Sequence, residues 1–568
     1  MPTQPPPEQE TARTRRMNAL FFDKSSSGWF GVSSVKFRVG APPLRPLPVE
    51  SVYNARFPPL EGLGFIEKAK EVLAANGLGD DEDADVNFIG RMVPGEPWTT
   101  QPTILIGTQW LDSSPKVWET IAIQLKRYVD EMAAPHGFDV AIEIMAPELI
   151  QPKYISPALD ENLPKLSEDW PTIKDEVVGI LELFPATASH MTTISLFRLG
   201  YDELVTKANP MTVYVSLDYE SDQLGWDPVV QEIQCYLDGF EHDLHVHLEH
   251  NVLNHFAFPL VAPNWDEAKI EIQNPRFGFQ VNPQYQTAVG PGADIGAARY
   301  ITRDDQHQVS PLLGTLGCYL EIQREGTPGW TKKAFARDPS PETQNDLDDK
   351  IAFFDQDRHL FGKVWAGSGY TRRTKTNGRL DWALIEPISQ DRVKGGQGQG
   401  QGINVLPDRD EWKSTQLLPR YMPYSPTFGT PLKPPPDGKR NLDQLGKDDL
   451  GYKIGTSTGA TVGVFNSVQT DCKIGDEKYM GLKNPYSTEY TFIGHAHHSP
   501  DGRFGDFGDS GAVVFDEEGR ALGLLFTGQS PNQCPPYGIN FVIPIEDVFE
   551  DIKAFSKGKI TGVRIANP

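Results

Sequence analysis

The sequence is poor in cysteine. It has four in 568 residues, at Cys235, Cys318, Cys472 and Cys534, and no two of them have the spacing of a CxxC motif. So few scattered cysteines do not predict a disulfide scaffold, and reduced thiols are expected. The sequence also lacks a run of about 18 apolar residues and an apolar stretch after Met1, which argues against a membrane-spanning helix and a secretory signal. Together these absences favour an intracellular protein, cytoplasmic or nuclear.

Positive charge is scarce as well. The chain has 53 Lys and Arg against 77 Asp and Glu, a formal net charge of −24. General binding to nucleic acid or to an anionic membrane needs a basic surface, so neither partner is expected. The length is enough for two or three domains with cores of their own.

Two stretches have the composition of segments without a packed core. Residues 1–16 are rich in proline and polar side chains, which predicts a disordered tail. Residues 388–450 contain a glycine/glutamine run at 395–402 and a proline triplet at 434–436. No Lys-Ser or Lys-Thr follows that run, so it is not a phosphate-binding loop. The composition predicts a flexible insertion between two folded parts.

The N-terminal half repeats a pattern at a constant offset, at which Trp118 aligns with Trp226. Apolar residues recur there every three or four positions, which predicts an amphipathic helix in each copy. An alternating strand follows each helix and includes Glu143 in the first copy and Glu249 in the second. The pattern predicts a duplicated strand–helix–strand unit, packed as an α/β layer structure and used for recognition or scaffolding. The module is expected over residues 17–285, with copies at about 85–155 and 192–260.

Histidines gather in the second copy. On an extended strand His245, His247 and Glu249 lie on one face, as metal ligands would. The first copy has Asp139 and Ala141 at the two histidine positions, so that ligand set is not repeated. Polar alternation on a solvent-exposed face explains the pattern equally well. No metal and no other cofactor is expected.

A glycine-bracketed serine occurs at Gly508-Asp-Ser-Gly511, ahead of an apolar run at 512–515, a turn at 516–519 and a second apolar run at 521–528. A serine nucleophile needs a tight turn whose backbone N–H groups point at a developing oxyanion. It also needs small neighbours that let a substrate carbonyl approach. The pattern predicts a nucleophile loop centred on Ser510, with an ordinary glycine-rich hairpin as the alternative.

This loop resembles the nucleophile loop of trypsin-like (chymotrypsin-fold) serine peptidases. Upstream, Arg379-Leu-Asp-Trp-Ala-Leu-Ile385 resembles the strand entry that carries the aspartate of their catalytic triad, although a strand-initiating aspartate in a turn has the same pattern. The resemblance covers about residues 290–560. It implies hydrolysis of peptide bonds by Ser510, with Asp381 orienting the base and a polypeptide as substrate or partner. It also implies an oxyanion hole formed by Gly508, Asp509 and Ser510.

The general base is missing from its expected place. A hairpin at 324–329 and a return strand from Trp330 resemble the region that precedes the family's histidine, but the chain continues from Ala334 into Phe335-Ala-Arg-Asp-Pro-Ser-Pro341. His359 lies later, at the start of another predicted strand. His495, His497 and His498 precede the nucleophile loop and offer an improvised base. Two explanations stay open: an inactive relative that binds peptides or proteins as a scaffold, or a chain that lacks a segment between Ala334 and Phe335.

The second barrel of the family has several counterparts. Residues 452–464 resemble its opening strand pair, 537–544 its final strand and 545–552 its closing helix. By analogy the pocket for the substrate residue before the scissile bond is lined by Thr527, Gly528 and Gly538, with Phe504 at its base and a preference for an apolar residue. The expected fold is multidomain: a duplicated α/β module, then an all-β double barrel of trypsin-like type. Its parts are a first barrel at 290–387, the insertion at 388–450, and a second barrel with a C-terminal helix at 451–568.

Overall fold

The computed structural model divides into two compact units. The first contains residues 1–153, 171–192 and 214–252, and the second contains 154–170, 193–213 and 253–568. The residues that the structure describes are 32–35, 37–41, 45, 47, 49–78, 84–93, 96–111, 113–149, 151–158, 163–203, 208–251, 253–255, 294–296, 313–326, 330–336, 361–369, 372–388, 404–406, 430–435, 442, 445–446, 449–455, 458–473, 485–494, 503–506, 508–531, 534 and 538–566. The predicted tail at 1–16, His359 and the histidines at 495–498 lie outside them.

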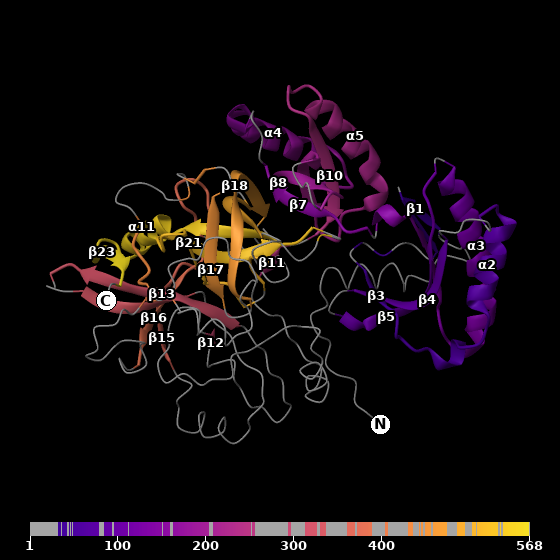
Figure 1. The fold of residues 1–568 in the computed structure, drawn as a ribbon, viewed down its shortest axis with the longest axis horizontal. Coiled ribbons are helices and arrows are strands. Elements are labelled where there is room, and N and C mark those ends of the chain that lie inside the picture. Colours follow the sequence, from indigo (N-terminus) through magenta and orange to yellow (C-terminus); the bar gives the residue numbers. More distant parts are fainter. Residues whose placement is uncertain are drawn as a thin grey trace, which may run out of the picture. The chain divides into compact units, whose positions relative to one another are not determined.

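The first unit contains a six-stranded mixed sheet in the order β1-β2-β6-β5-β4-β3. Helices α2 and α3 cover one face of this sheet (Figure 1). The apolar stripe predicted for the first copy is confirmed, because Trp118, Ile121 and Leu125 are fully buried against the sheet. The elements are β1 (Ser33–Val35), β2 (Arg38–Ala41), β3 (Glu50–Val52), η1 (Pro58–Leu60), α2 (Phe65–Ala75), β4 (Asp85–Val93), β5 (Glu96–Gly107), α3 (Ser114–Ala133), η2 (Ala134–His136), β6 (Ala141–Met145) and η3 (Pro147–Leu149).

In the region where the second copy was predicted, β8, β9, α5 and β10 follow one another, as β4, β5, α3 and β6 do in the region of the first. The strand orders are β6-β5-β4 and β10-β9-β8. Trp226, Val229 and Ile233 of α5 are buried, as the pattern predicts. The boundary between the units passes through β8 and β9. The elements are β7 (Tyr154–Pro157), α4 (Leu163–Leu183), β8 (Met191–Gly200), β9 (Met211–Leu217), η5 (Gln223–Gly225), α5 (Trp226–Leu237) and β10 (Leu244–His250).

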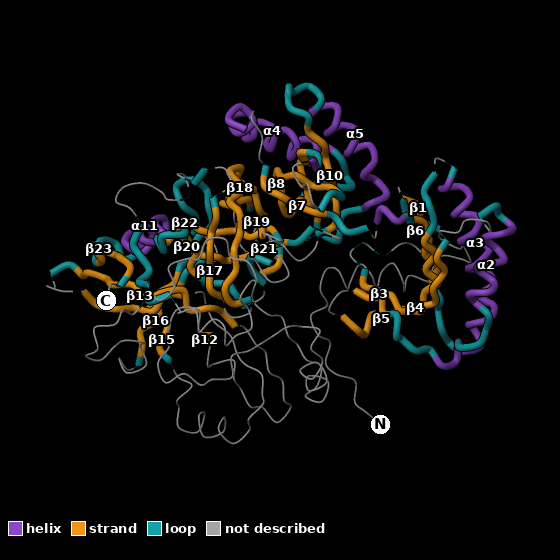
Figure 2. Tube along the Cα trace, viewed as in Figure 1, coloured by secondary structure: helices purple, strands orange, loops and turns teal. Residues whose placement is uncertain are grey.

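In the second unit six strands close on themselves. The pairings run β18-β17-β20-β21-β22-β19, and β19 pairs again with β18, which completes the ring. The strands and the helix predicted here are confirmed: Ile545, Val548 and Ile552 of α11 are buried. Figure 2 shows this region as mainly strand. The elements are β17 (Leu450–Gly455), β18 (Gly459–Lys473), β19 (Tyr486–Gly494), β20 (Val513–Phe515), β21 (Ala521–Gln529), β22 (Ile539–Pro544) and α11 (Ile545–Phe555).

A second sheet of this unit has the order β12-β13-β14-β16-β15, and β23 pairs with β13. Its strands are β12 (Asp294–Gly296), β13 (Leu313–Arg324), β14 (Trp330–Ala336), β15 (Gly362–Gly367), β16 (Ala383–Pro387) and β23 (Ile560–Ile565). The residues after α11 were expected to belong to the second barrel. Instead β23 pairs with β13, since Leu320 and Ile565 are opposite each other and Ala566 N–H donates to the carbonyl of Tyr319.

Parts of the predicted flexible insertion are packed, which corrects that expectation for these residues. The Asn404 side chain donates to the carbonyls of Tyr319 and Ala566 and accepts from the N–H of Tyr319, so it joins β13 to the end of the chain. Leu442 is buried in the core of the six-stranded ring. These contacts require a fixed backbone, because they satisfy buried polar groups and bury apolar surface.

Residues from the N-terminal half also belong to the second unit. Strand β8 pairs with β18 at Thr193 and Ile194, and β7 pairs with β8. Asn466 accepts from the N–H of Ala158 and donates to the carbonyl of Leu196, so one buried side chain connects three segments. None of the four cysteines, all of them among the described residues, forms a disulfide. None of the described helices is both long and apolar enough to span a membrane.

Candidate active site

The Ser510 loop is a tight turn directly before β20, one of the strands of the six-stranded ring. Gly508 and Gly511 have φ angles of 94° and 98°, in the region that favours glycine. The loop is anchored to β21 by two backbone hydrogen bonds, from Gly511 N–H to the carbonyl of Leu525 (2.8 Å) and from Leu525 N–H to the carbonyl of Ala512 (2.9 Å). The two glycines noted in the sequence therefore allow the backbone to adopt the tight turn that a nucleophile loop requires.

The Ser510 hydroxyl is buried and donates to the carbonyl of Phe526 at 2.8 Å. Phe526 lies on β21, one residue beyond the loop's last backbone contact. A hydroxyl in this position has its proton directed at a backbone oxygen. The hydroxyl has to rotate before it can donate that proton to a general base, although its oxygen can still accept a hydrogen bond.

The residue before the serine, Asp509, forms a buried ion pair with Lys453. The Asp509 carboxylate lies 2.7 Å from Lys453 Nζ, and both side chains are fully buried. It also accepts from Thr458 Oγ1 (2.6 Å), Thr458 N–H (3.2 Å) and Asp506 N–H (3.0 Å). Burial lowers the pKa of Lys453, and the charge of Asp509 opposes that shift. Sequence patterns did not indicate this partner, because Lys453 was identified only as part of a strand pattern.

Gly455 makes room for the ion pair. A Cβ atom at this position would lie 2.2 Å from Asp509 Oδ1 and 2.8 Å from Lys453 Nζ, closer than real contacts allow. Strand β17 therefore supplies both the lysine and the glycine that the Asp509 carboxylate needs. A second close approach comes from the other sheet, where a Cβ on Gly317 of β13 would lie 2.4 Å from the carbonyl oxygen of Gly511.

The segment of Asp381 reaches the same strand as the Ser510 hydroxyl. Asp381 is 7% exposed. Two residues earlier, the Arg379 guanidinium lies over the Phe526 ring, 5.7 Å from its centroid. The N–H of Arg379 donates to Glu489 at 2.9 Å, and burial raises the pKa of that glutamate. Phe526 therefore makes two contacts at the site: its carbonyl accepts a hydrogen bond from the Ser510 hydroxyl, and its ring lies under the Arg379 guanidinium.

Strand β14 ends beside this segment. Ala336 is opposite Ala383, two residues after Asp381. Ala334 and Phe335 are paired with β13 in unbroken succession, opposite Tyr319 and Cys318. The strand therefore continues through the point at which a missing segment was considered. Its own geometry does not require an inserted residue there.

The predicted pocket residues have different surroundings. Phe504 lies in the core of the ring, fully buried, with its ring centroid 5.5 Å from that of Phe492. Thr527 and Gly528 lie near the end of β21, and Gly538 has a φ of 59° just before β22. Strand β11 (Asn254–His255) pairs antiparallel with Thr527 and Gly528. The sequence did not predict this pairing, because a two-residue strand leaves no periodic pattern.

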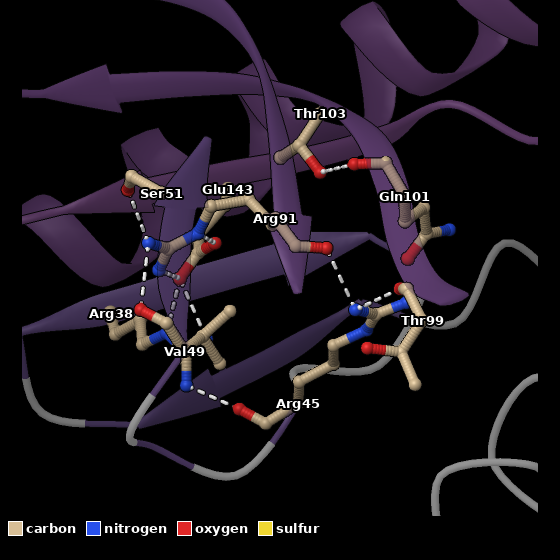
Figure 3. Close-up of polar contacts among 9 residues, drawn as sticks. All are labelled: Arg38, Arg45, Val49, Ser51, Arg91, Thr99, Gln101, Thr103 and Glu143. Carbon is tan, nitrogen blue, oxygen red and sulfur yellow. Dashed lines mark hydrogen bonds and ion pairs between the residues drawn. The ribbon is translucent and has the colours of Figure 1, made fainter. Parts of the chain in front are cut away.

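A second polar centre lies in the first unit, on the sheet face opposite the helices (Figure 3). Glu143 bridges two buried arginines: its carboxylate lies 2.6 Å from Arg38 Nη2 and 2.9 Å from Arg91 Nε. Arg91 also donates to Ser51 Oγ (2.8 Å) and the carbonyl of Val49 (3.2 Å). Burial alone would raise the pKa of Glu143, but the two guanidinium groups outweigh it and lower the pKa from 4.5 to about 2. Because the three charged side chains are paired with one another, we interpret the cluster as one that stabilises the fold.

The aligned glutamate of the second copy is buried in a different network. Tyr214 donates to Glu249 at 2.6 Å, and His247 Nε2 lies 3.1 Å from the same carboxylate. Burial raises the pKa of Glu249, but the His247 contact, Lys153 and Tyr214 lower it overall. His245 is 54% exposed and lies 3.8 Å from Asp243. Across the described part of the chain, no group of three His, Cys, Asp or Glu side chains is placed to hold a metal ion.

Comparison with known proteins gives structural likenesses only. The sequence matches no protein-family model, and no curated protein is similar enough in sequence to count as a relative. Among solved structures, Thermobifida fusca Protease A is 11% identical at a TM-score of 0.23, with 50% of this chain and 100% of that one covered. Cellulomonas bogoriensis chymotrypsin is 12% identical at 0.22, covering 50% and 99%. A glutamic acid specific serine protease with a histidine triad in substrate binding is 11% identical at 0.23, covering 44% and 93%. At such TM-scores these likenesses carry no argument about fold or activity.

Proposed function

We propose that about residues 290–560 form a homologue of trypsin-like serine peptidases, with Ser510 as the nucleophile for peptide-bond hydrolysis. The observation that carries the proposal is the loop around Ser510: two glycines with positive φ bracket the serine, and a buried carboxylate held by four donors lies beside it. An ordinary hairpin has no need of a buried ion pair under its turn, since such pairs are costly to bury. The closed ring of six strands that carries the loop supports the same proposal.

In this function Ser510 Oγ attacks the carbonyl carbon of a peptide bond. The backbone N–H groups of Gly508 and Ser510 stabilise the oxyanion that forms, where fixed donors act on developing charge most effectively. The N–H of Asp509 instead donates to the carbonyl of Asp506 at 3.0 Å, which holds the loop. In the family a histidine oriented by the aspartate takes the serine proton, a role that suits the nearly buried Asp381 carboxylate. No histidine stands at that place in this sequence, so hydrolysis requires one from elsewhere in the chain. Thr527, Gly528 and Gly538 line the pocket for the residue before the scissile bond, with Phe504 behind them in the core.

A non-catalytic peptide- or protein-binding scaffold is the second candidate. It is favoured by the Ser510 hydroxyl, whose proton is engaged by the carbonyl of Phe526. It is favoured also by the five residues after β14, Arg337–Pro341, which contain no histidine. A serine without a base is a poor nucleophile, although the oxyanion hole alone leaves some catalysis.

Labelling with a fluorophosphonate probe separates the two candidates. An activated Ser510 is labelled stoichiometrically in the full chain, and Ser510→Ala abolishes the label. Asp381→Asn should slow labelling strongly, because the base loses its orienting carboxylate. Absence of labelling in the wild-type protein, with its fold intact, would overturn hydrolysis and leave the scaffold.

A further inference from the structure

The edge of β21 next to Ser510 is occupied by another segment of the same chain. A strand has two hydrogen-bonding edges. β22 pairs with β21 from Gly523 to Gln529 on one of them. Gly523 and Leu524 pair with β20 as well, so β20 lies on the opposite edge. Thr527 and Gly528 pair with both β22 and β11, so β11 lies on the β20 edge too.

Along that edge the partners follow one another without a gap. Val513, the first residue of β20, is opposite Leu524, and the N–H and carbonyl of Leu525 bond to the loop at Ala512 and Gly511. Ser510 Oγ donates to the carbonyl of Phe526. The next residue, Thr527, is opposite His255. Because β11 is antiparallel to β21, it runs from Gly528 toward Phe526. The strand therefore runs toward the residue whose carbonyl accepts from the serine hydroxyl.

We propose that Asn254–His255 is an autoinhibitory segment of this chain, which occupies the strand-docking site at the backbone of Thr527–Gly528 until an extended polypeptide displaces it. The inference rests on the proposed function, because it takes the edge beside Ser510 as the place where a polypeptide binds. Addition of a strand to a sheet edge derives its affinity from main-chain hydrogen bonds. β11 pairs over two residues only, so a segment that pairs over more residues gains more hydrogen bonds and displaces it.

Proline substitutions in the full chain test whether the backbone pairing of Asn254–His255 with β21 blocks binding of a peptide. Successive residues of a strand direct their N–H groups to opposite sides, so one of Asn254 and His255 faces β21. Of Asn254→Pro and His255→Pro, one removes a hydrogen bond to β21 and the other is its matched control. Asn254→Ala keeps every backbone group. The probe is a fluorescent synthetic peptide with the sequence of residues 251–259, and its binding is followed by fluorescence anisotropy.

At least one proline variant should bind the probe ten-fold or more tightly than the wild-type protein, and Asn254→Ala should behave as wild type. Equal binding by all four proteins would overturn the proposal. Hydrogen exchange on the wild-type protein gives a measurement that needs no variant. Excess probe should speed exchange in peptides covering 253–255 and leave α11 unchanged. Unchanged exchange at 253–255 with bound probe would also overturn it.

Fluorophosphonate labelling of the same proteins shows whether a failure belongs to this inference or to the proposed hydrolysis. If the probe binds and displaces 253–255 but Ser510 is not labelled, the docking site stands and hydrolysis fails. If Ser510 is labelled and the probe neither binds nor displaces 253–255, hydrolysis stands and the docking site fails.

Discussion

Lys453 Nζ lies 2.7 Å from the Asp509 carboxylate, and both side chains are excluded from solvent. The residue after Asp509 is the candidate nucleophile, so the position of the Ser510 backbone depends on this pair. Removing one partner of a buried ion pair leaves an uncompensated charge, whereas replacing both is often tolerated.

Lys453→Met should therefore lower the free energy of unfolding of the ring by about 3–5 kcal/mol. Denaturant unfolding measures the change. The double variant Lys453→Met/Asp509→Asn removes both charges and should recover more than half of the loss. If the double variant is less stable than Lys453→Met, the pair is not the source of the effect.

Gly455→Ala should disturb the same pair without changing any charge. The added Cβ would lie 2.2 Å from Asp509 Oδ1, and overpacking of this kind costs about 1–3 kcal/mol. Gly446→Ala is the matched control, because its nearest neighbour would be 3.8 Å away. Thermal unfolding of both variants tests this. A Gly455→Ala protein as stable as Gly446→Ala would contradict the close approach.

Glu143 should make the first unit sensitive to acid. Its pKa is lowered from 4.5 to about 2, so its stabilising contribution is complete above pH 4.5 and is lost as the pH falls toward 2. The shift corresponds to about 3 kcal/mol. Hydrogen exchange of β2 and β6 in the full chain, corrected for the intrinsic pH dependence of exchange, should show protection falling across this range.

Glu143→Gln should cost about 3–5 kcal/mol in the same strands at neutral pH, because it leaves two buried guanidinium groups without their carboxylate. Glu71→Gln is the control, since the Lys68–Glu71 pair is exposed and should change stability by less than about 0.5 kcal/mol. Equal effects of the two substitutions would show that the cluster is not stabilising.

Asn466→Ala should loosen β7 and β8 from the ring. The substitution leaves the N–H of Ala158 and the carbonyl of Leu196 without their partner, at about 1–3 kcal/mol for each buried group. Faster hydrogen exchange in 154–158 and 193–199 is expected. Gln469→Ala is the control, because the Gln469 contact to Trp170 uses its backbone carbonyl. Unchanged exchange in Asn466→Ala would show that this side chain does not join the segments.

Local patterns predicted the secondary structure well. The apolar stripes of α3, α5 and α11, the hairpin of β13 and β14, and the two strands that follow the Ser510 loop all appear where the spacing places them. Such patterns depend on contacts within a few residues. Strands β11 and β23 were missed, because each is specified mainly by a partner far away in the chain, β21 for one and β13 for the other.

The candidate site likewise combines features that local sequence patterns predict with features that only distant partners determine. Residue types alone indicated the turn around Ser510 and the carboxylate at Asp381, since glycine spacing and strand alternation are local properties. Which groups surround them was decided by the tertiary structure: Lys453 beside Asp509, the carbonyl of Phe526 under the Ser510 hydroxyl, and Asn254–His255 along the edge of β21. The physical reason is that buried charges and strand edges must be satisfied by whatever the fold brings near, and these partners lie tens to hundreds of residues away in the sequence.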